Sequence, residues 1–267
     1  MTTARRAAAR KQPATGETPE AAETDNRYDL RGRVVLIPGG LGGIGQAVSR
    51  AFAAAGATVV IAGESERPAE LDALRQSVGA NVSERVSFQP ANVIDEASVE
   101  ALVWTVVERH RRLDILVNLV GGWMAGQPVS ALDLDTWQRM LDLNLRSAFL
   151  LAKHAARPMT QQGWGRILHL SSRGARTGRR NAAAYAVAKN AVITLTEVQA
   201  EELRDANITV NAILPSIVDT PANRTSMPKA DFSRWPKAEE VARVLLFLAS
   251  EDAKLISGAA IPVYGQA

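Results

Sequence analysis

Two side chains in the second half of the chain have the types and spacing needed to transfer a proton. Tyr185 and Lys189 are four residues apart in a segment of helical character, so they lie on one face of a helix. An ammonium group beside a phenol stabilises the phenolate and lowers the phenol pKa from about 10 toward the working range. Such a phenol can protonate a carbonyl or deprotonate an alcohol. Because this spacing is also common on ordinary helix surfaces, the pair needs support from other residues.

Two more polar residues precede the pair at defined distances. Ser172 ends a short apolar run 13 residues before Tyr185, and Asn144 lies 28 residues before Ser172. In type and spacing these residues resemble the Asn-Ser-Tyr-Lys tetrad of the short-chain dehydrogenase/reductase family, and the resemblance extends over about residues 30–265. It implies that Ser172 polarises a substrate carbonyl, Tyr185 is the general acid/base, Lys189 also binds the nicotinamide ribose, and Asn144 holds a water of the proton relay. Ser171 is one residue too far from Tyr185 for the serine role.

A glycine-rich turn follows the first apolar run of the chain. It reads P-G-G-L-G-G-I-G over residues 38–45 and opens a helical segment. Glycines let the backbone turn sharply and approach a pyrophosphate, while the helix that follows presents free N–H groups to the anion. The glycine spacing resembles that of the same family, although Pro38 stands where the family usually has threonine. The residues of the turn expected to contact a cofactor are Gly39, Gly43, Ile44 and Gly45.

The elements that must position these residues alternate between strands and helices. Short apolar runs predict strands at 34–37, 58–62, 85–88, 114–118, 166–171, 208–213 and 259–263. Helical segments are predicted at about 45–55, 67–78, 95–111, 134–161, 181–204 and 238–249. This alternation predicts an α/β fold, a doubly wound Rossmann-type parallel sheet of seven strands with helices on both faces, in a single domain over 27–267.

The residues after the second predicted strand bear on the choice of cofactor. In the family an acidic residue here usually binds the adenine ribose of NAD, whereas an arginine pairs with the 2′-phosphate of NADP. This chain has Gly63 and then Glu64, which favours NAD(H), while Ser65 and Arg67 leave NADP(H) open. The resemblance also assigns cofactor contacts to Asn92, Val93, Asn118, Gly121, Tyr185, Lys189, Pro215, Ile217 and Thr220.

The substrate side is less constrained by the sequence. Residues 216–236 are predicted to form a lid, irregular and mobile over 223–235. With Gly121–Trp123, this segment resembles dihydropteridine reductase of the same family, which leaves a quinonoid ring open as an alternative to a 3-oxoacyl or other ketone substrate. The candidate substrate contacts are Trp123, Arg173, Arg179 and Trp235. The arginines suit an anionic substrate or acyl-carrier partner, but they also suit a solvated loop or a subunit contact.

Composition limits the remaining function classes. The chain has 267 residues, a formal charge of +3, no cysteine and three histidines, so we expect no disulfide and no metal site. It has no basic stripe and no long apolar run, and we predict a cytoplasmic homo-oligomer, a dimer or tetramer, that binds neither nucleic acid nor membrane. Residues 1–26 are predicted to be a disordered tail, with a transit peptide as the alternative. The alternative of another class is a non-catalytic NAD-binding regulatory protein, against which the complete tetrad argues.

Overall fold

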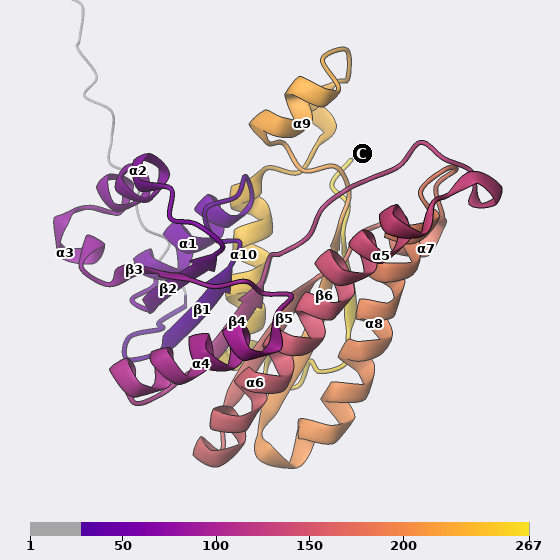
Figure 1. The fold of residues 1–267 in the computed structure, drawn as a ribbon. Helices are drawn as coiled ribbons and strands as arrows, with labels where there is room; N and C mark the ends of the chain where they lie inside the picture. Colours follow the sequence, from indigo (N-terminus) through magenta and orange to yellow (C-terminus); the bar gives the residue numbers. More distant parts are fainter. Residues whose placement is uncertain (1–27, 267) are drawn as a thin grey trace, which may run out of the picture.

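Seven short strands form one parallel sheet in the computed structural model, which describes residues 28–266 (Figure 1). Their order across the sheet is β3-β2-β1-β4-β5-β6-β7. The strands are β1 Val34–Pro38, β2 Thr58–Gly63, β3 Val86–Pro90, β4 Ile115–Asn118, β5 Gly165–Leu170, β6 Ile208–Pro215 and β7 Ala260–Val263. The predicted sheet is confirmed, with strand ends that differ by at most two residues. The predicted tail of residues 1–26 lies outside the described residues.

Helices cover both faces of the sheet (Figure 1). They are α1 Gly45–Ala54, α2 Pro68–Val78, α3 Ala80–Ser83, α4 Glu96–His110, α5 Leu134–Leu141, α6 Ser147–Gln162, α7 Gly174–Thr177, α8 Ala183–Leu203, α9 Pro221–Ser226 and α10 Ala238–Ala249. Alternation along β1 supplies both layers of the core: Val35 and Ile37 pack with α1 and α10, whereas Val34 and Leu36 pack with α4 and α6. The sheet is therefore buried on both sides, as its apolar strands require.

The strand order reverses at β1: β2 and β3 lie on one side of β1 in the sheet, and β4 to β7 lie on the other side. At such a switch point the loops after adjacent strands diverge and leave a crevice outside their carboxyl ends. The glycine turn follows β1 at this edge. The loops after β4, β5 and β6 lie at the same edge, because these strands are parallel to β1. The topology therefore gathers the predicted site residues from distant parts of the chain.

Two segments differ from the sequence-based expectation. The predicted helix over 134–161 is divided into α5 and α6 by a turn of π-helix at Asp142–Arg146. The lid segment, expected to be irregular over 223–235, contains α9 and a 3₁₀ turn at Phe232–Arg234. That expectation was wrong because local capping stabilises short helices there. The Thr220 hydroxyl accepts a hydrogen bond from the Asn223 N–H, and Pro221 occupies the first turn, where no N–H is needed.

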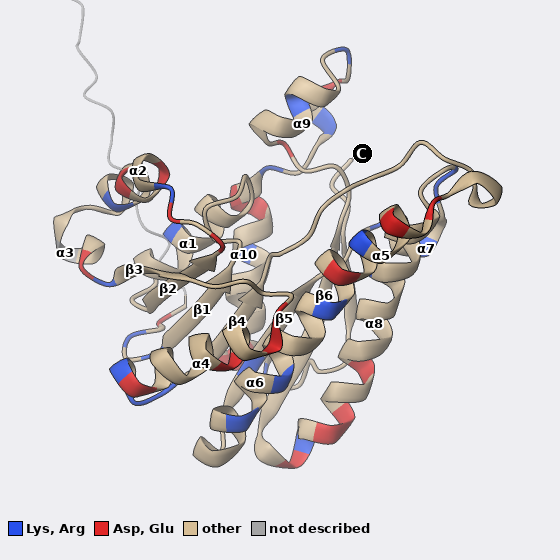
Figure 2. Cartoon of the chain, viewed as in Figure 1, with Lys and Arg blue, Asp and Glu red and all other residues tan. Residues whose placement is uncertain are grey.

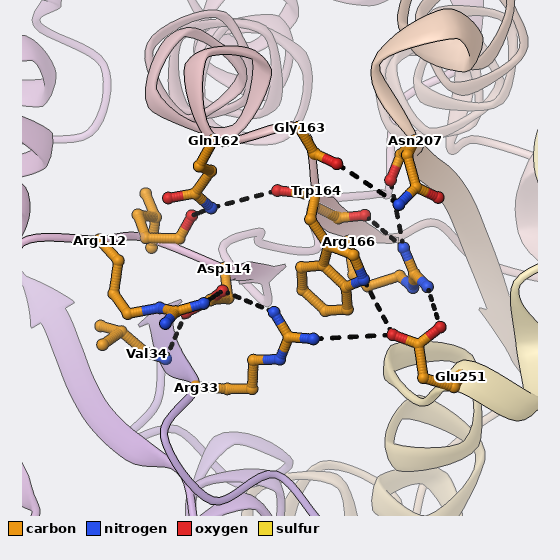
Figure 3. A network of polar contacts seen from close by, with 12 residues as sticks. Arg33, Val34, Arg112, Asp114, Gln162, Gly163, Trp164, Arg166, Asn207 and Glu251 are labelled. Carbon is orange, nitrogen blue, oxygen red and sulfur yellow. Dashed lines mark hydrogen bonds and ion pairs between the residues drawn. The ribbon is translucent and has the colours of Figure 1, made fainter.

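At the amino-terminal edge of the sheet, opposite the glycine turn, Asp114 is fully buried in a polar network (Figure 3). Its carboxylate accepts hydrogen bonds from Arg33 at 3.0 Å, from Arg112 at 2.6 and 2.7 Å, and from the Val34 N–H at 2.9 Å. The two arginines compensate the desolvation of the carboxylate, and the bond to Val34 joins the start of β1 to the residue that precedes β4. The network therefore joins neighbouring strands through a buried charge.

The same network extends to β5 through an aromatic ring (Figure 3). Trp164 lies between two guanidinium groups, with the Arg33 Cζ 3.6 Å and the Arg166 Cζ 4.3 Å from its ring centroid. Glu251 accepts a hydrogen bond from the Trp164 indole at 2.9 Å and forms an ion pair with each arginine. Arg166 is completely buried, so its charge depends on these partners.

Surface charge is mixed over the described part of the chain. Figure 2 shows Lys and Arg interspersed with Asp and Glu on the helices facing the viewer. Within residues 28–266, no helix has both the length and the apolar character that a membrane span requires.

Candidate active site

The glycine turn forms a close-packed backbone loop between β1 and α1. Gly39 has φ +81°, a left-handed conformation that side chains rarely adopt, and its N–H donates to the Ala62 carbonyl at 2.9 Å. A Cβ on Gly45 would lie 2.2 Å from the Gly39 carbonyl oxygen, so the start of α1 can approach the turn only as glycine. Pro38 does not disturb the loop, since its carbonyl accepts the Leu119 N–H at 3.1 Å. The cradle fits the backbone approach that a dinucleotide pyrophosphate needs.

The loop after β5 and helix α8 bring Ser172 and Tyr185 together. A Cβ added at Gly174 would lie 3.5 Å from the Ser172 hydroxyl oxygen and 3.6 Å from the Tyr185 ring, so these two side chains are neighbours. The Ser172 hydroxyl oxygen accepts the Gly174 N–H at 3.1 Å. Ser171 has a different role: it is buried, and its hydroxyl donates to the Lys189 carbonyl of α8 at 2.7 Å. Of the two serines, Ser172 is the one whose hydroxyl group lies beside the Tyr185 ring.

Asn144 lies behind the site, in the π-helical turn, and is buried. Its side-chain amide donates to the Gly122 carbonyl and accepts the Gly122 N–H, both at 3.1 Å. These two bonds hold the loop after β4 against the end of α5. The position of Gly121 is equally constrained, because a Cβ there would lie 2.8 Å from the Asn144 Oδ1 and 2.9 Å from the Lys189 Nζ. Asn144 and Lys189 therefore approach the same backbone position.

The pKa values of the acid/base pair differ from the simple expectation. Burial raises the pKa of Tyr185 and the nearby Ser172 side chain opposes this rise, while Lys189 is not among the groups that shift the pKa. Lys189 is buried, donates to the Leu170 carbonyl at 2.7 Å, and has its pKa lowered to about 8 by desolvation. The expectation that Lys189 lowers the phenol pKa is not met in this structure, because the ammonium group is directed to a backbone carbonyl.

This buried lysine leads to a stability prediction. Between pH 8 and the ordinary lysine value of 10.5, the folded chain binds fewer protons at Lys189 than the unfolded chain, so stability rises with pH in that window. Below pH 8 the cost of the buried charge is fully present. We expect Lys189→Met to raise the free energy of unfolding at pH 7 by about 1–3 kcal/mol, a gain that shrinks toward pH 10.

Urea unfolding of wild type and variant at a series of pH values measures this gain. Lys254→Met, at an exposed position, is the matched control and should leave stability nearly unchanged. A Lys189 variant that is less stable than wild type throughout the pH range would contradict the prediction.

Two adjoining cavities lie at this edge of the sheet. The inner cavity, of about 350 Å³, adjoins the glycine turn and Lys189; the outer cavity, of about 560 Å³, is bounded by the loop 172–179 and by α9. Both are lined by Trp123, Ser172, Tyr185, Ser216 and Asn223. Ser172 and Tyr185 therefore stand where the two cavities meet, at a position from which they can contact molecules in both.

Most of the predicted cofactor contacts line the inner cavity. They are Gly39, Gly43, Ile44, Gly45, Gly121, Tyr185, Lys189, Pro215 and Thr220. Ile217 lines the outer cavity instead. Asn118 and Val93 are buried, and the Asn118 carboxamide oxygen accepts the Val120 N–H at 3.1 Å, which shapes the loop after β4. Glu64 and Asn92 are exposed beyond the ends of β2 and β3, outside the lining of both cavities.

Of the candidate substrate contacts, Trp123, Arg173 and Arg179 line the outer cavity. Trp235 does not line either cavity: it is buried, with its ring 4.9 Å from that of Phe232, and so packs within the lid segment. Sequence reasoning did not single out the lid residues Asn223, Ser226 and Met227, which also line the outer cavity. Asn223 and Ser226 lie on α9 and Met227 follows its last residue, and the sequence pattern did not predict this helix.

Comparisons with known proteins agree with this geometry. The family model described as enoyl-(acyl carrier protein) reductase matches residues 39–265. The 3-oxoacyl-[acyl-carrier-protein] reductase FabG of Thermotoga maritima is 34% identical over 88% of this chain and 98% of its own. A short-chain type dehydrogenase/reductase from Mycobacterium ulcerans has 31% identity and a TM-score of 0.82, covering 89% of this chain and 90% of that one. ElxO with NADP bound has 27% identity and a TM-score of 0.80, covering 87% and 97%.

Proposed function

The chain belongs to the short-chain dehydrogenase/reductase family, an NAD(P)-binding family of oxidoreductases acting on carbonyl and alcohol groups, and we propose that Tyr185 is its general acid/base. One observation carries the assignment: Ser172 and Tyr185 are neighbours that line both the inner and the outer cavity. A carbonyl entering from the outer cavity can therefore meet two hydroxyl groups at once. We further propose that Asn144, Ser172, Tyr185 and Lys189 act as the tetrad that the sequence suggested.

In reduction, Ser172 and Tyr185 bind the carbonyl oxygen and stabilise the negative charge that develops on it. The bound nicotinamide supplies the hydride in reduction and accepts it in oxidation. Burial raises the pKa of Tyr185, which keeps the phenol protonated and ready to donate its proton to that oxygen. Lys189 and the glycine turn line the inner cavity and would hold the ribose and the pyrophosphate, and Asn144 fixes the backbone loop around Gly122.

An absorbance assay tests the activity. The protein is mixed with NADH or NADPH and a panel of diketones, 3-oxoacyl esters, cyclic ketones and a quinonoid pterin, and cofactor oxidation is followed at 340 nm. We expect turnover of at least one ketone class. Binding of cofactor without turnover of any carbonyl would favour the regulatory alternative. The reduction of a quinonoid ring, which the lid's resemblance to dihydropteridine reductase suggested, stays a prediction, and the assay with the quinonoid pterin tests it.

We propose that NAD(H) is preferred over NADP(H). Glu64 follows β2 directly, and a carboxylate there repels a 2′-phosphate and can accept a hydrogen bond from a free ribose hydroxyl. The nearest basic residue after the strand, Arg67, has its guanidinium 3.5 Å from Glu70. We expect the wild type to have the higher kcat/KM with NADH, and Glu64→Arg to shift the ratio toward NADPH by roughly 10-fold or more.

Steady-state kinetics with both cofactors on one ketone measures this ratio. Glu66→Arg, two residues farther along and also exposed, is the control and should change it much less. A wild type that prefers NADPH, or a ratio that Glu64→Arg leaves unchanged, would overturn the proposed preference.

We also propose that the chain is a homo-oligomer through the outer face of α8. Val187 and Val198 line a groove along α8, and Phe149 of α6 lines a second groove that shares Leu195 with the first; these three residues are 46%, 48% and 45% exposed. Exposed apolar residues grouped in this way are suited to a two-fold contact with a second copy. We expect Val187→Glu to lower the mass measured by light scattering, and Glu202→Lys, toward the end of α8, to leave it unchanged. A monomeric wild type would contradict this proposal. The cytoplasmic location expected from the sequence stays a prediction.

A further inference from the structure

Arg179 lines the outer cavity beside Trp123, whose ring contacts that of Tyr185. The Trp123 ring contacts the Tyr185 ring edge-on, with 4.6 Å between centroids and an interplanar angle of 75°. The Arg179 Cζ lies 5.2 Å from the centroid of the Trp123 ring. The Arg179 Cζ therefore lies at most 9.8 Å, the sum of these two distances, from the centroid of the Tyr185 ring.

The loops that carry Arg179 and Trp123 are tied to one another. Arg179 begins a turn closed by a hydrogen bond from the Ala182 N–H to its carbonyl at 3.1 Å. Within that turn Asn181 has φ +62°, and its carbonyl accepts the Gly126 N–H at 2.9 Å, which joins the turn to the loop that follows β4. The position of the guanidinium relative to the phenol therefore depends on backbone bonds as well as on the ring contact.

The charge of Arg179 is uncompensated in its surroundings. Among the described residues it forms an ion pair with no carboxylate, and no Asp or Glu occurs among the described residues that line either cavity. The lining of the outer cavity also includes the apolar side chains of Ile217, Met227 and Trp123. A cavity of about 560 Å³ that is lined by these apolar side chains, by the Ser172 and Tyr185 hydroxyl groups and by the guanidinium groups of Arg173 and Arg179 is complementary to a small molecule of matching polarity.

We propose that Arg179 binds the carboxylate of the substrate, so that this enzyme acts on small oxo acids and hydroxy acids in which a short apolar body separates carbonyl and carboxylate. This inference rests on the proposed function, since it takes Ser172 and Tyr185 as the carbonyl end of the site. A planar guanidinium forms paired, charge-assisted hydrogen bonds with a carboxylate, and stacking on Trp123 leaves its N–H edges available. Arg179 lines the outer cavity and not the inner one, which separates this role from cofactor binding.

The first test compares 4-oxocyclohexanecarboxylate with its methyl ester, which has the same ring and ketone without the charge. We expect the wild type to have the higher kcat/KM for the acid. Arg179→Met should lower kcat/KM for the acid by roughly 10- to 100-fold, mainly through KM, and leave the ester nearly unchanged. Arg179→Lys should recover part of the loss. Arg180→Met, next in the chain and outside the lining of the cavity, is the matched control.

The second test measures binding and does not depend on turnover. Calorimetric titration of the NAD⁺-saturated enzyme with cyclohexanecarboxylate and with cyclohexanecarboxamide should show at least about tenfold tighter binding of the carboxylate. This preference should vanish in Arg179→Met and persist in Arg180→Met. Equal affinity for the two probes, no detectable binding of either, or a preference that survives in Arg179→Met overturns the inference. Carboxylate binding that persists without turnover of any ketone overturns the proposed function instead.

Discussion

Tyr185→Phe is expected to lower kcat by about 10²- to 10⁴-fold, the range that loss of a positioned general acid/base produces. The change removes only the hydroxyl group, so the ring stays in edge-on contact with Trp123 and the cavities keep their shape. Because the pyrophosphate is expected to bind at the glycine turn, cofactor affinity should change little. Stopped-flow or steady-state rates, with a separate NADH fluorescence titration, measure the two effects independently.

Tyr28→Phe is the control for this substitution. Tyr28 packs against Phe247, with 6.2 Å between the ring centroids, and it lines neither cavity. The same chemical change there should leave kcat within about twofold, as for a surface substitution away from the site. Substantial turnover by the Tyr185 variant would mean that the proton comes from another group, and the assignment of the acid/base would be lost.

The second large effect is expected in the buried network of Figure 3. Asp114→Ala should lower the free energy of unfolding by about 3–5 kcal/mol, since it leaves Arg33 and Arg112 without their shared carboxylate and the Val34 N–H without its acceptor. All of these groups lie at the amino-terminal edge of the sheet, opposite the site. Activity of the folded variant should therefore persist at low temperature.

Urea unfolding at one fixed protein concentration measures this loss, because oligomerisation makes apparent stability depend on concentration. The control is Glu100→Ala, which removes the ion pair with Arg157 between α4 and α6. The side chains of Glu100 and Arg157 are both more than half exposed, so their ion pair should contribute only about 0–1 kcal/mol to the free energy of unfolding. Equal losses in the two variants would show that the buried network does not stabilise the fold.

The order of strands and helices was predictable because local pattern determines it. Continuous apolar runs can be buried only in a sheet covered on both faces, and the intervening segments are long enough for helical crossovers. The lid was not predictable in the same way. Helix α9 has six residues, and its start depends on the Thr220 cap and on Pro221, a signal too short for periodicity to detect.

The site residues were predictable where motif and spacing coincide, as for the glycine turn and for Ser172 and Tyr185. Their electrostatics were not. Spacing alone places Lys189 one helical turn from Tyr185, but the folded chain directs its ammonium group to the Leu170 carbonyl and desolvates it. The spacing to Tyr185 favoured Ser172 over Ser171, whereas the contact of Ser171 with the Lys189 carbonyl depends on the position of α8 against β5.

By itself, then, the amino-acid sequence determined the class of fold and predicted the cradle for a dinucleotide and the proposed reacting groups, because each of these is encoded over a short stretch by residue type and periodicity. The tertiary structure alone decided that Ser172 and Tyr185 line two adjoining cavities, that Trp235 packs inside the lid segment, and that Arg179 lies over Trp123 in the lining of the outer cavity. The contacts around Ser172, Tyr185 and Arg179 are made between segments that are far apart in the sequence or lie in different loops. Their distances arise only when the whole core is packed.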